Sequence, residues 1–258
     1  ELAELFGEIV GTRVLFILDE YDRVADQAFR RDVAELIKNL SDRGARAQLV
    51  LTGVASNLEE LIGFTPSIRR NIVGLFVGPM ADAEMTTILE RAEAQSGLRF
   101  AADARARILR MAGGSPYLTR LLGGRAAGRA LDDGRSTVVA DDVLAGTEQV
   151  LAEWNAALPR RVQGQLQRPE VRSAWPALIA AARASGTPDG WFMADDVAAE
   201  LPDHDPAAAR RLLEGFTGAI DLFDRSSEAE GREPRFRFRT QGVAQLLGLS
   251  AALARAGR

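Results

Sequence analysis

Two neighbouring carboxylates, Asp19 and Glu20, are the residues whose setting in the sequence most clearly suggests chemistry. They follow an apolar run at residues 14–18, whose Val, Leu, Phe and Ile side chains predict the central strand of a parallel sheet, buried on both faces. Ligands of open α/β sheets bind at the carboxyl ends of the strands, where we expect this acid pair to lie. A carboxylate there can organise Mg²⁺, and a second one can orient an attacking water molecule.

This arrangement has the form of a Walker B motif, whose usual companion is a glycine-rich phosphate-binding loop ending in Gly-Lys-Ser or Gly-Lys-Thr. No such loop occurs in the 258 residues, and the only lysine, Lys38, has no glycines before it. We therefore expect an ATPase core without its first half, as a fragment of a longer protein. Such a chain should neither bind ATP tightly nor hydrolyse it by itself, because the backbone phosphate cradle is missing.

Composition and charge exclude several other kinds of site. The net charge of −4 predicts no general affinity for nucleic acid or anionic membranes. The absence of cysteine excludes disulfides and thiolate metal sites, and the lone His204, between Asp203 and Asp205, indicates a solvated turn rather than a metal site. With no apolar run of membrane-spanning length and no signal peptide, the chain is expected to be cytoplasmic.

The first part of the chain alternates between helical and strand patterns. After the acid-tipped strand come a helix at residues 26–40, a second buried strand at 48–53 and a third strand at 72–77. This alternation predicts a parallel sheet with right-handed crossovers. Residues 1–78 are thus interpreted as a partial α/β core, and its exposed face and edge should leave apolar surface that needs a partner.

The rest of the chain is mainly helical. Helices are predicted at residues 82–96, 103–112, 115–131 and 140–158, which gives an all-α bundle over 79–158. A polar stretch with prolines at both ends predicts a linker over 159–170. The last region, 171–258, combines three helices and a closing helix with two strands, which are the elements of a winged helix; the helices are expected at 171–184, 193–201, 205–216 and 243–254, and the strands at 219–224 and 235–239.

In this order of elements the chain resembles, over its whole length, the AAA+/STAND group of P-loop ATPases. The resemblance implies that Asp19 holds Mg²⁺ through its water shell and that Glu20 polarises the attacking water. Thr52, at the tip of the second strand, is similar to the sensor residue that contacts the γ-phosphate, with Asn57 as a second candidate. Hydrolysis of ATP would then serve as a conformational switch.

Two further motifs extend the resemblance. Arg70, with Arg69 as the alternative, lies where the family carries an arginine finger, which implies self-association because such an arginine reaches the nucleotide of a neighbouring subunit. The turn at residues 114–116 is similar to the Gly-x-Pro element of STAND proteins, which implies that Gly114 and Pro116 lie against the nucleotide in a helical lid. The resemblance implies ATP or ADP and Mg²⁺ as ligands, which would bind only together with the missing upstream half.

Each motif also has a plainer interpretation, because acid-tipped strands, paired arginines and Gly-x-Pro turns are common in unrelated proteins. Their order and spacing favour the family. Two other functions stay open: a DNA-binding or replication-initiator-like module, and a non-catalytic scaffold for protein partners.

The DNA-binding alternative depends on arginines in the predicted winged helix. Alternation with two phenylalanines should bury the aromatic rings and expose the arginines of the last strand on one face. With the arginines of the helix predicted at 205–216, these strand arginines could bind DNA phosphates. Nearby acids instead favour internal packing or protein contacts. The residues concerned are Arg210, Arg211, Arg235, Arg237 and Arg239.

Overall fold

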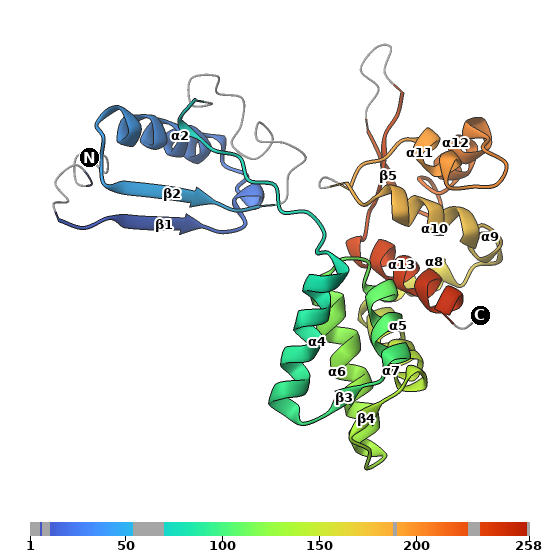
Figure 1. Ribbon diagram of the computed structural model, residues 1–258. Coiled ribbons are helices and arrows are strands. Elements are labelled where there is room, and N and C mark those ends of the chain that lie inside the picture. Colours follow the sequence, from blue (N-terminus) through green and yellow to red (C-terminus); the bar gives the residue numbers. More distant parts are fainter. Residues whose placement is uncertain (1–5, 7–10, 54–69, 188–189, 227–232, 257–258) are drawn as a thin grey trace. The chain divides into compact units, whose positions relative to one another are not determined.

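The computed structural model describes residues 6, 11–53, 70–187, 190–226 and 233–256. These residues form two compact units (Figure 1). The first unit consists of the described residues up to Val77 together with Thr187, and the second comprises the other described residues from Gly78 onward.

The first unit is a β–α–β arrangement. Strands β1 (Val14–Leu18) and β2 (Ala47–Leu51) pair in parallel, with Phe16 opposite Leu49, and helix α2 (Gln27–Asp42) connects them. The carboxylate of Asp26 caps α2 by accepting a hydrogen bond from the amide of Ala28 at 2.8 Å. The two predicted strands and the helix between them are therefore confirmed.

Only one face of this sheet is covered. Side chains alternate between the two faces of a strand, and Val14, Phe16 and Leu18 are half-buried whereas Leu15 and Ile17 are 56% and 61% exposed. The prediction of a strand buried on both faces is therefore wrong for the described residues, and the expected uncovered apolar face is present. The apolar run does not distinguish a covered face from one that lacks its cover, and the uncovered face was expected because the first half of the core is missing.

The predicted third strand at 72–77 is also absent. These residues adopt no regular structure, and Val73, Leu75, Phe76 and Val77 are 84–90% exposed. A strand needs a neighbour to satisfy its backbone groups, and in the described part of the chain β1 and β2 pair only with each other. The composition of the segment favours a strand, but neither of the strands described in this unit pairs with it.

The second unit begins with the predicted helical bundle. Helices α4 (Asp82–Ser96), α5 (Ala102–Ala112), α6 (Pro116–Asp132) and α7 (Ala140–Ala157) lie within one residue of the expected bounds at each end. Their core includes Leu89, Ile108, Leu122, Val143 and Val150. Two-residue strands β3 (Arg99–Phe100) and β4 (Thr137–Val138) pair in parallel; neither was predicted, because two residues are too few to show an alternation.

A glycine allows the two central bundle helices to pack closely. A Cβ atom at Gly146 of α7 would lie 3.0 Å from Cβ of Arg125 and 3.1 Å from the backbone nitrogen of Ala126 in α6. Such distances are shorter than ordinary contacts, so a side chain at this position would require the neighbouring helix to shift slightly.

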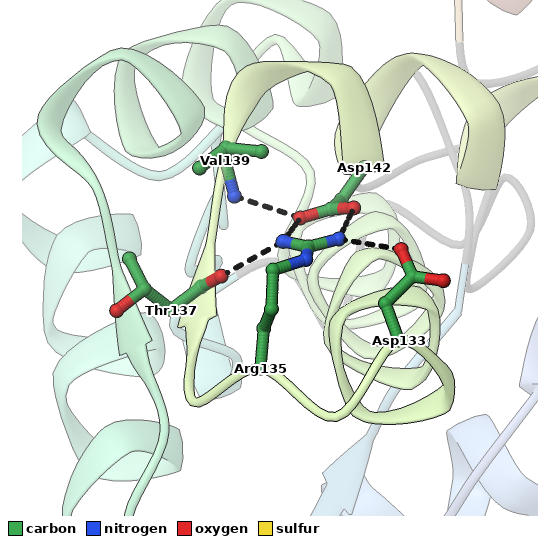
Figure 2. A network of polar contacts seen from close by, with 5 residues as sticks. All are labelled: Asp133, Arg135, Thr137, Val139 and Asp142. Carbon is green, nitrogen blue, oxygen red and sulfur yellow. Dashed lines mark hydrogen bonds and ion pairs between the residues drawn. The ribbon is translucent and has the colours of Figure 1, made fainter.

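A polar network joins the start of α7 to the turn before β4 (Figure 2). The guanidinium of Arg135 donates to both carboxylate oxygens of Asp142, at 2.6 and 2.8 Å, and to Asp133 at 2.8 Å. Asp142 also accepts a hydrogen bond from the amide of Val139 at 2.8 Å and so caps the helix. The bonds from Arg135 are the main cause that lowers the pKa of Asp142, which burial opposes.

The C-terminal part of the second unit follows with short helices and a hairpin. Helices α8 (Arg160–Leu166), α9 (Pro169–Ser173), α10 (Trp175–Ala184), α11 (Ala194–Ala199) and α12 (Pro206–Gly215) precede the antiparallel pair β5 (Phe223–Arg225) and β6 (Phe236–Phe238), and α13 (Gln241–Ala256) closes the chain. The expected linker at 159–170 thus contains a helix, because Val162 and Leu166 lie one helical turn apart and are buried. The helix expected at 171–184 is divided at Ala174.

Helix α13 belongs to two hydrophobic clusters. Its residues Val243 and Leu247 are buried among the C-terminal helices, whereas Leu249 is buried in the core of the bundle. From α7, Leu151 and Trp154 pack against both clusters. The bundle and the C-terminal part therefore share a continuous apolar interior.

Candidate functional site

The candidate site lies at the carboxyl ends of β1 and β2. Asp19 follows β1 and Thr52 follows β2, so the parallel pairing brings them together. The hydroxyl of Thr52 donates a hydrogen bond to Oδ1 of Asp19. Backbone bonds fix the same edge: the amide of Thr52 donates to the carbonyl of Leu18 at 3.0 Å, and the amide of Tyr21 donates to the carbonyl of Thr52 at 2.8 Å.

These contacts keep the carboxylate of Asp19 ionised and oriented. Oδ1 also accepts a hydrogen bond from the amide of Glu20 at 2.9 Å. The Thr52 hydroxyl, and after it the Glu20 amide, lower the pKa of Asp19 below its usual value. Among the described residues no donor contacts Oδ2, and the side chain is exposed.

Glu20 occupies an unusual backbone conformation. Its φ of 53° and ψ of 37° place it in the left-handed region, which costs energy for a residue other than glycine. The reversal starts a 3₁₀ turn, η1 (Tyr21–Arg23), directly after the acids. The side chain of Glu20 pairs with Arg23 at 3.1 Å, and because both are exposed this ion pair can open at little cost.

The turn after the acids is firmly anchored. Tyr21 is 2% exposed, and the guanidinium of Arg30 lies 5.6 Å from the centre of its ring. Arg30 also donates to the carbonyl oxygens of Val24, at 2.7 Å, and Asp22, at 2.9 Å. A rigid turn fixes where Asp19 and Glu20 leave the strand.

The structure does not bring the expected arginine finger into this cluster. Arg70 is exposed, and among the described residues no hydrogen bond or ion pair joins it to Asp19 or Thr52. Arg69 and Asn57 lie outside the described residues. An arginine that acts on a neighbouring subunit would not contact its own acids, so this role stays a prediction.

Local contacts hold the Gly-x-Pro turn of the second unit, and its role beside the nucleotide stays a prediction. Gly114 has φ of +84°, and a Cβ atom there would lie 2.6 Å from Cβ of Pro79. Its carbonyl accepts a hydrogen bond from the amide of Met80 at 2.9 Å. Ser115 caps α6 by accepting from the amide of Leu118 at 3.2 Å, and Pro116 occupies the first turn, where proline is favoured.

Two arginines of the expected DNA-binding face, Arg237 and Arg239, are exposed but paired. Phe236 and Phe238 are buried, as the alternation predicts. Arg237 pairs with Asp224 at 3.2 Å, and Arg239 pairs with Asp224 at 3.0 Å and with Asp221 at 2.7 Å.

A second set of contacts on this face was not predicted from the sequence. The guanidinium groups of Arg235 and Arg237 lie 5.9 and 4.7 Å from the ring centre of Trp191. On α12, Arg210 pairs with Glu214 at 3.0 Å, while Arg211 is exposed. These pairings favour internal packing, and DNA binding stays a prediction.

The donor atoms at the strand tips are oxygens, which suit hard divalent cations. Within the described ranges there is no group of three or more histidine or carboxylate side chains that could enclose a metal ion. Asp19 and Thr52 offer a carboxylate and a hydroxyl. This set fits Mg²⁺, which keeps several water molecules and takes one or two carboxylates plus phosphate oxygens.

Comparisons with known proteins give distant likenesses. No family model matches the chain, and no curated protein matches it. Among solved structures, RuvB of Thermotoga maritima, a Holliday junction branch migration motor, is 16% identical, with 92% of this chain and 71% of that chain covered and a TM-score of 0.49. The ORC2 protein of Aeropyrum pernix, in ADPNP–ADP complexes, is 16% identical, with coverage of 94% and 66% and a TM-score of 0.44.

Likenesses this distant leave the function to be argued from the residues of the chain. A further observation concerns membranes: across the described part of the chain, no helix has both the length and the apolar character that a membrane span requires.

Proposed function

We propose that this chain supplies the acid-bearing half of an ATP–Mg²⁺ site in an AAA+/STAND-like ATPase that uses hydrolysis as a conformational switch. The observation that carries the proposal is the hydrogen bond from Thr52 to Asp19 across the tips of two adjacent parallel strands. It joins an ionised carboxylate and a hydroxyl at the edge of the sheet where ligands of α/β proteins bind.

Each residue of the cluster has a distinct task in this proposal. Asp19 holds the water shell of the metal through the oxygen that Thr52 leaves available. Thr52 orients Asp19 and contacts the terminal phosphate of ATP. Glu20 leaves Arg23 and accepts a hydrogen bond from the attacking water. Bound Mg²⁺ would neutralise charge on the phosphates.

The remaining regions take their tasks from the same proposal. The helical bundle over 79–158 acts as a lid, with Gly114 and Pro116 against the nucleotide, and residues 171–258 form a winged-helix region. Arg70 reaches the nucleotide of a neighbouring copy in the assembled protein.

Nucleotide binding by calorimetry with Mg²⁺ tests the proposal. ATP and ADP are titrated into this chain and into a version extended upstream, because the 258 residues contain no phosphate-binding loop. We expect binding only by the extended version, and loss of its turnover with Glu20→Gln while binding is retained. Absence of binding by both versions would overturn the proposal.

DNA binding is the second candidate, favoured by the exposed arginine face of β6 beside Trp191. Its charge is offset by Asp221 and Asp224. Affinity for duplex DNA that falls with salt and disappears on changing Arg235 and Arg237 to Gln would support it.

A further inference from the structure

A cleft of about 280 Å³ opens in the second unit where α7, α8, α9, α10 and α13 meet. Leu151, Leu166 and Leu246 give it an apolar lining, and Asn155, Arg172 and Trp175 supply polar and aromatic groups. The volume is near the lower limit of typical small-molecule sites, which measure about 300–1,000 Å³. No part of the proposed ATP site contributes to this cleft.

Arg172 is held in place at the cleft by two neighbours. Its Nη2 donates a hydrogen bond to Oε1 of Gln167 at 2.9 Å, and its guanidinium lies 5.1 Å from the ring centre of Trp175. Both partners are neutral. In the described part of the chain no carboxylate pairs with Arg172, in contrast to Arg125, which pairs with Glu153 from the same bundle.

The guanidinium of Arg172 beside the apolar lining favours a ligand that has both a negative charge and an apolar part. A guanidinium binds a carboxylate through two parallel hydrogen bonds. A phosphate would bring nearly two charges, whereas the other polar groups that line the cleft, among them Asn155 and Ser250, are neutral. The single cation therefore matches a single negative charge.

We propose that this cleft binds a small monocarboxylic acid with an apolar body. The carboxylate lies on the guanidinium of Arg172, and the apolar body packs against Trp175 and the leucines of the lining. This site goes beyond the proposed ATPase function and does not depend on it.

The location of the cleft gives binding a structural consequence. Leu151 packs against both hydrophobic clusters of the second unit, and Leu246 comes from the helix that the clusters share. A ligand there contacts the bundle and the C-terminal helices together. Because it binds the folded unit alone, it should raise the melting temperature, and the rise should continue with the logarithm of ligand concentration above the dissociation constant.

The chain contains three tryptophans, at positions 154, 175 and 191, which allows a direct test. In ¹⁵N-labelled protein each indole N–H gives one NMR signal, assigned with Trp154→Phe and Trp191→Phe. 4-Phenylbutyrate is titrated into the 258-residue chain, with 4-phenylbutanamide as a neutral probe of the same shape. We expect a saturable shift of the Trp175 signal with the acid. The affinity for the amide should be weaker by a factor of about ten or more.

Variants then test the role of the guanidinium. Arg172→Gln should weaken binding of the acid about tenfold and leave binding of the amide unchanged. Arg168→Gln is the matched control, because Arg168 is close in sequence, pairs with Glu170 and does not line the cleft. A lack of saturable shift, equal affinity for acid and amide, or full affinity of Arg172→Gln would each overturn the proposal. If Arg172→Gln does not fold, the comparison of acid and amide on the unchanged protein decides.

Discussion

At the scale of single residues, the hydrogen bond between Thr52 and Asp19 turns two unremarkable strand ends into a candidate site. Neither residue is informative alone, since many strands end in Thr or Asp. The pairing of β1 with β2 places them together, and the hydroxyl then lowers the pKa of the carboxyl. A carboxylate held ionised by neutral donors is suited to a cation.

The first prediction concerns this bond. Thr52→Val removes the hydroxyl and keeps the shape of the side chain, so the pKa of Asp19 should rise toward its usual value because its main stabilising contact is lost. Thr52→Ser retains the hydroxyl and serves as the control. An NMR titration of the Asp19 carboxyl carbon measures both; an unchanged pKa in Thr52→Val would mean that the bond does not persist in solution.

A second prediction at this scale concerns Asp142. The folded-state pKa of Asp142 lies below its unfolded value, so its contribution to stability is complete above the unfolded pKa and is lost as the pH falls through the folded pKa. Asp142→Asn should therefore lower the free energy of unfolding by about 2 kcal/mol at pH 7. The difference from the unchanged protein should shrink below a pH of about 4.

Urea denaturation at several pH values measures this effect. Asp141→Asn is the matched control, because Asp141 lies in the same helical turn but is exposed. A loss of stability in Asp142→Asn that stayed constant from pH 7 to pH 3 would contradict a stabilising role of the ionised carboxylate.

At the scale of elements, the sequence predicted what local signals determine. The four bundle helices begin and end as expected because Ser115 caps α6 and Gly97 and Gly113 end α4 and α5. The prediction of a strand at 72–77 was wrong because a strand depends on pairing with a segment elsewhere in the chain. The pairing of Arg237 with Trp191 was missed because it joins a loop to a strand 46 positions away in sequence.

The third prediction concerns the contact between α6 and α7. Gly146→Ala should destabilise the second unit by about 1–3 kcal/mol, because its new methyl group meets the backbone of Ala126. Gly124→Ala is the control in α6, where nothing lies within 4 Å of the added atom. It should stabilise by up to about 1 kcal/mol through reduced freedom of the unfolded chain. Thermal and urea unfolding compare the two; equal effects would show that the helices can move apart without cost.

At the scale of the whole molecule, the boundary expected between the bundle and the C-terminal region is crossed by packing. The expected linker contains α8, and α13 inserts into both hydrophobic clusters. A switch in which these two regions rotate against each other would have to expose Leu247 or Leu249 to water. The apolar interior therefore favours movement of the second unit as a single body.

The last prediction tests this coupling. Leu247→Ala opens a cavity in the C-terminal cluster and Leu249→Ala opens one in the bundle, each at a cost of about 2–4 kcal/mol. If the unit unfolds cooperatively, each variant should lower the protection of the α5 amides against hydrogen exchange by the full free energy that it costs the unit, although Leu247 packs in the other cluster. Leu213→Ala, in α12, extends the test to a residue outside α13. Unchanged α5 protection in Leu247→Ala and Leu213→Ala would mean that the two clusters open independently, and that α13 can detach from one while it remains packed in the other.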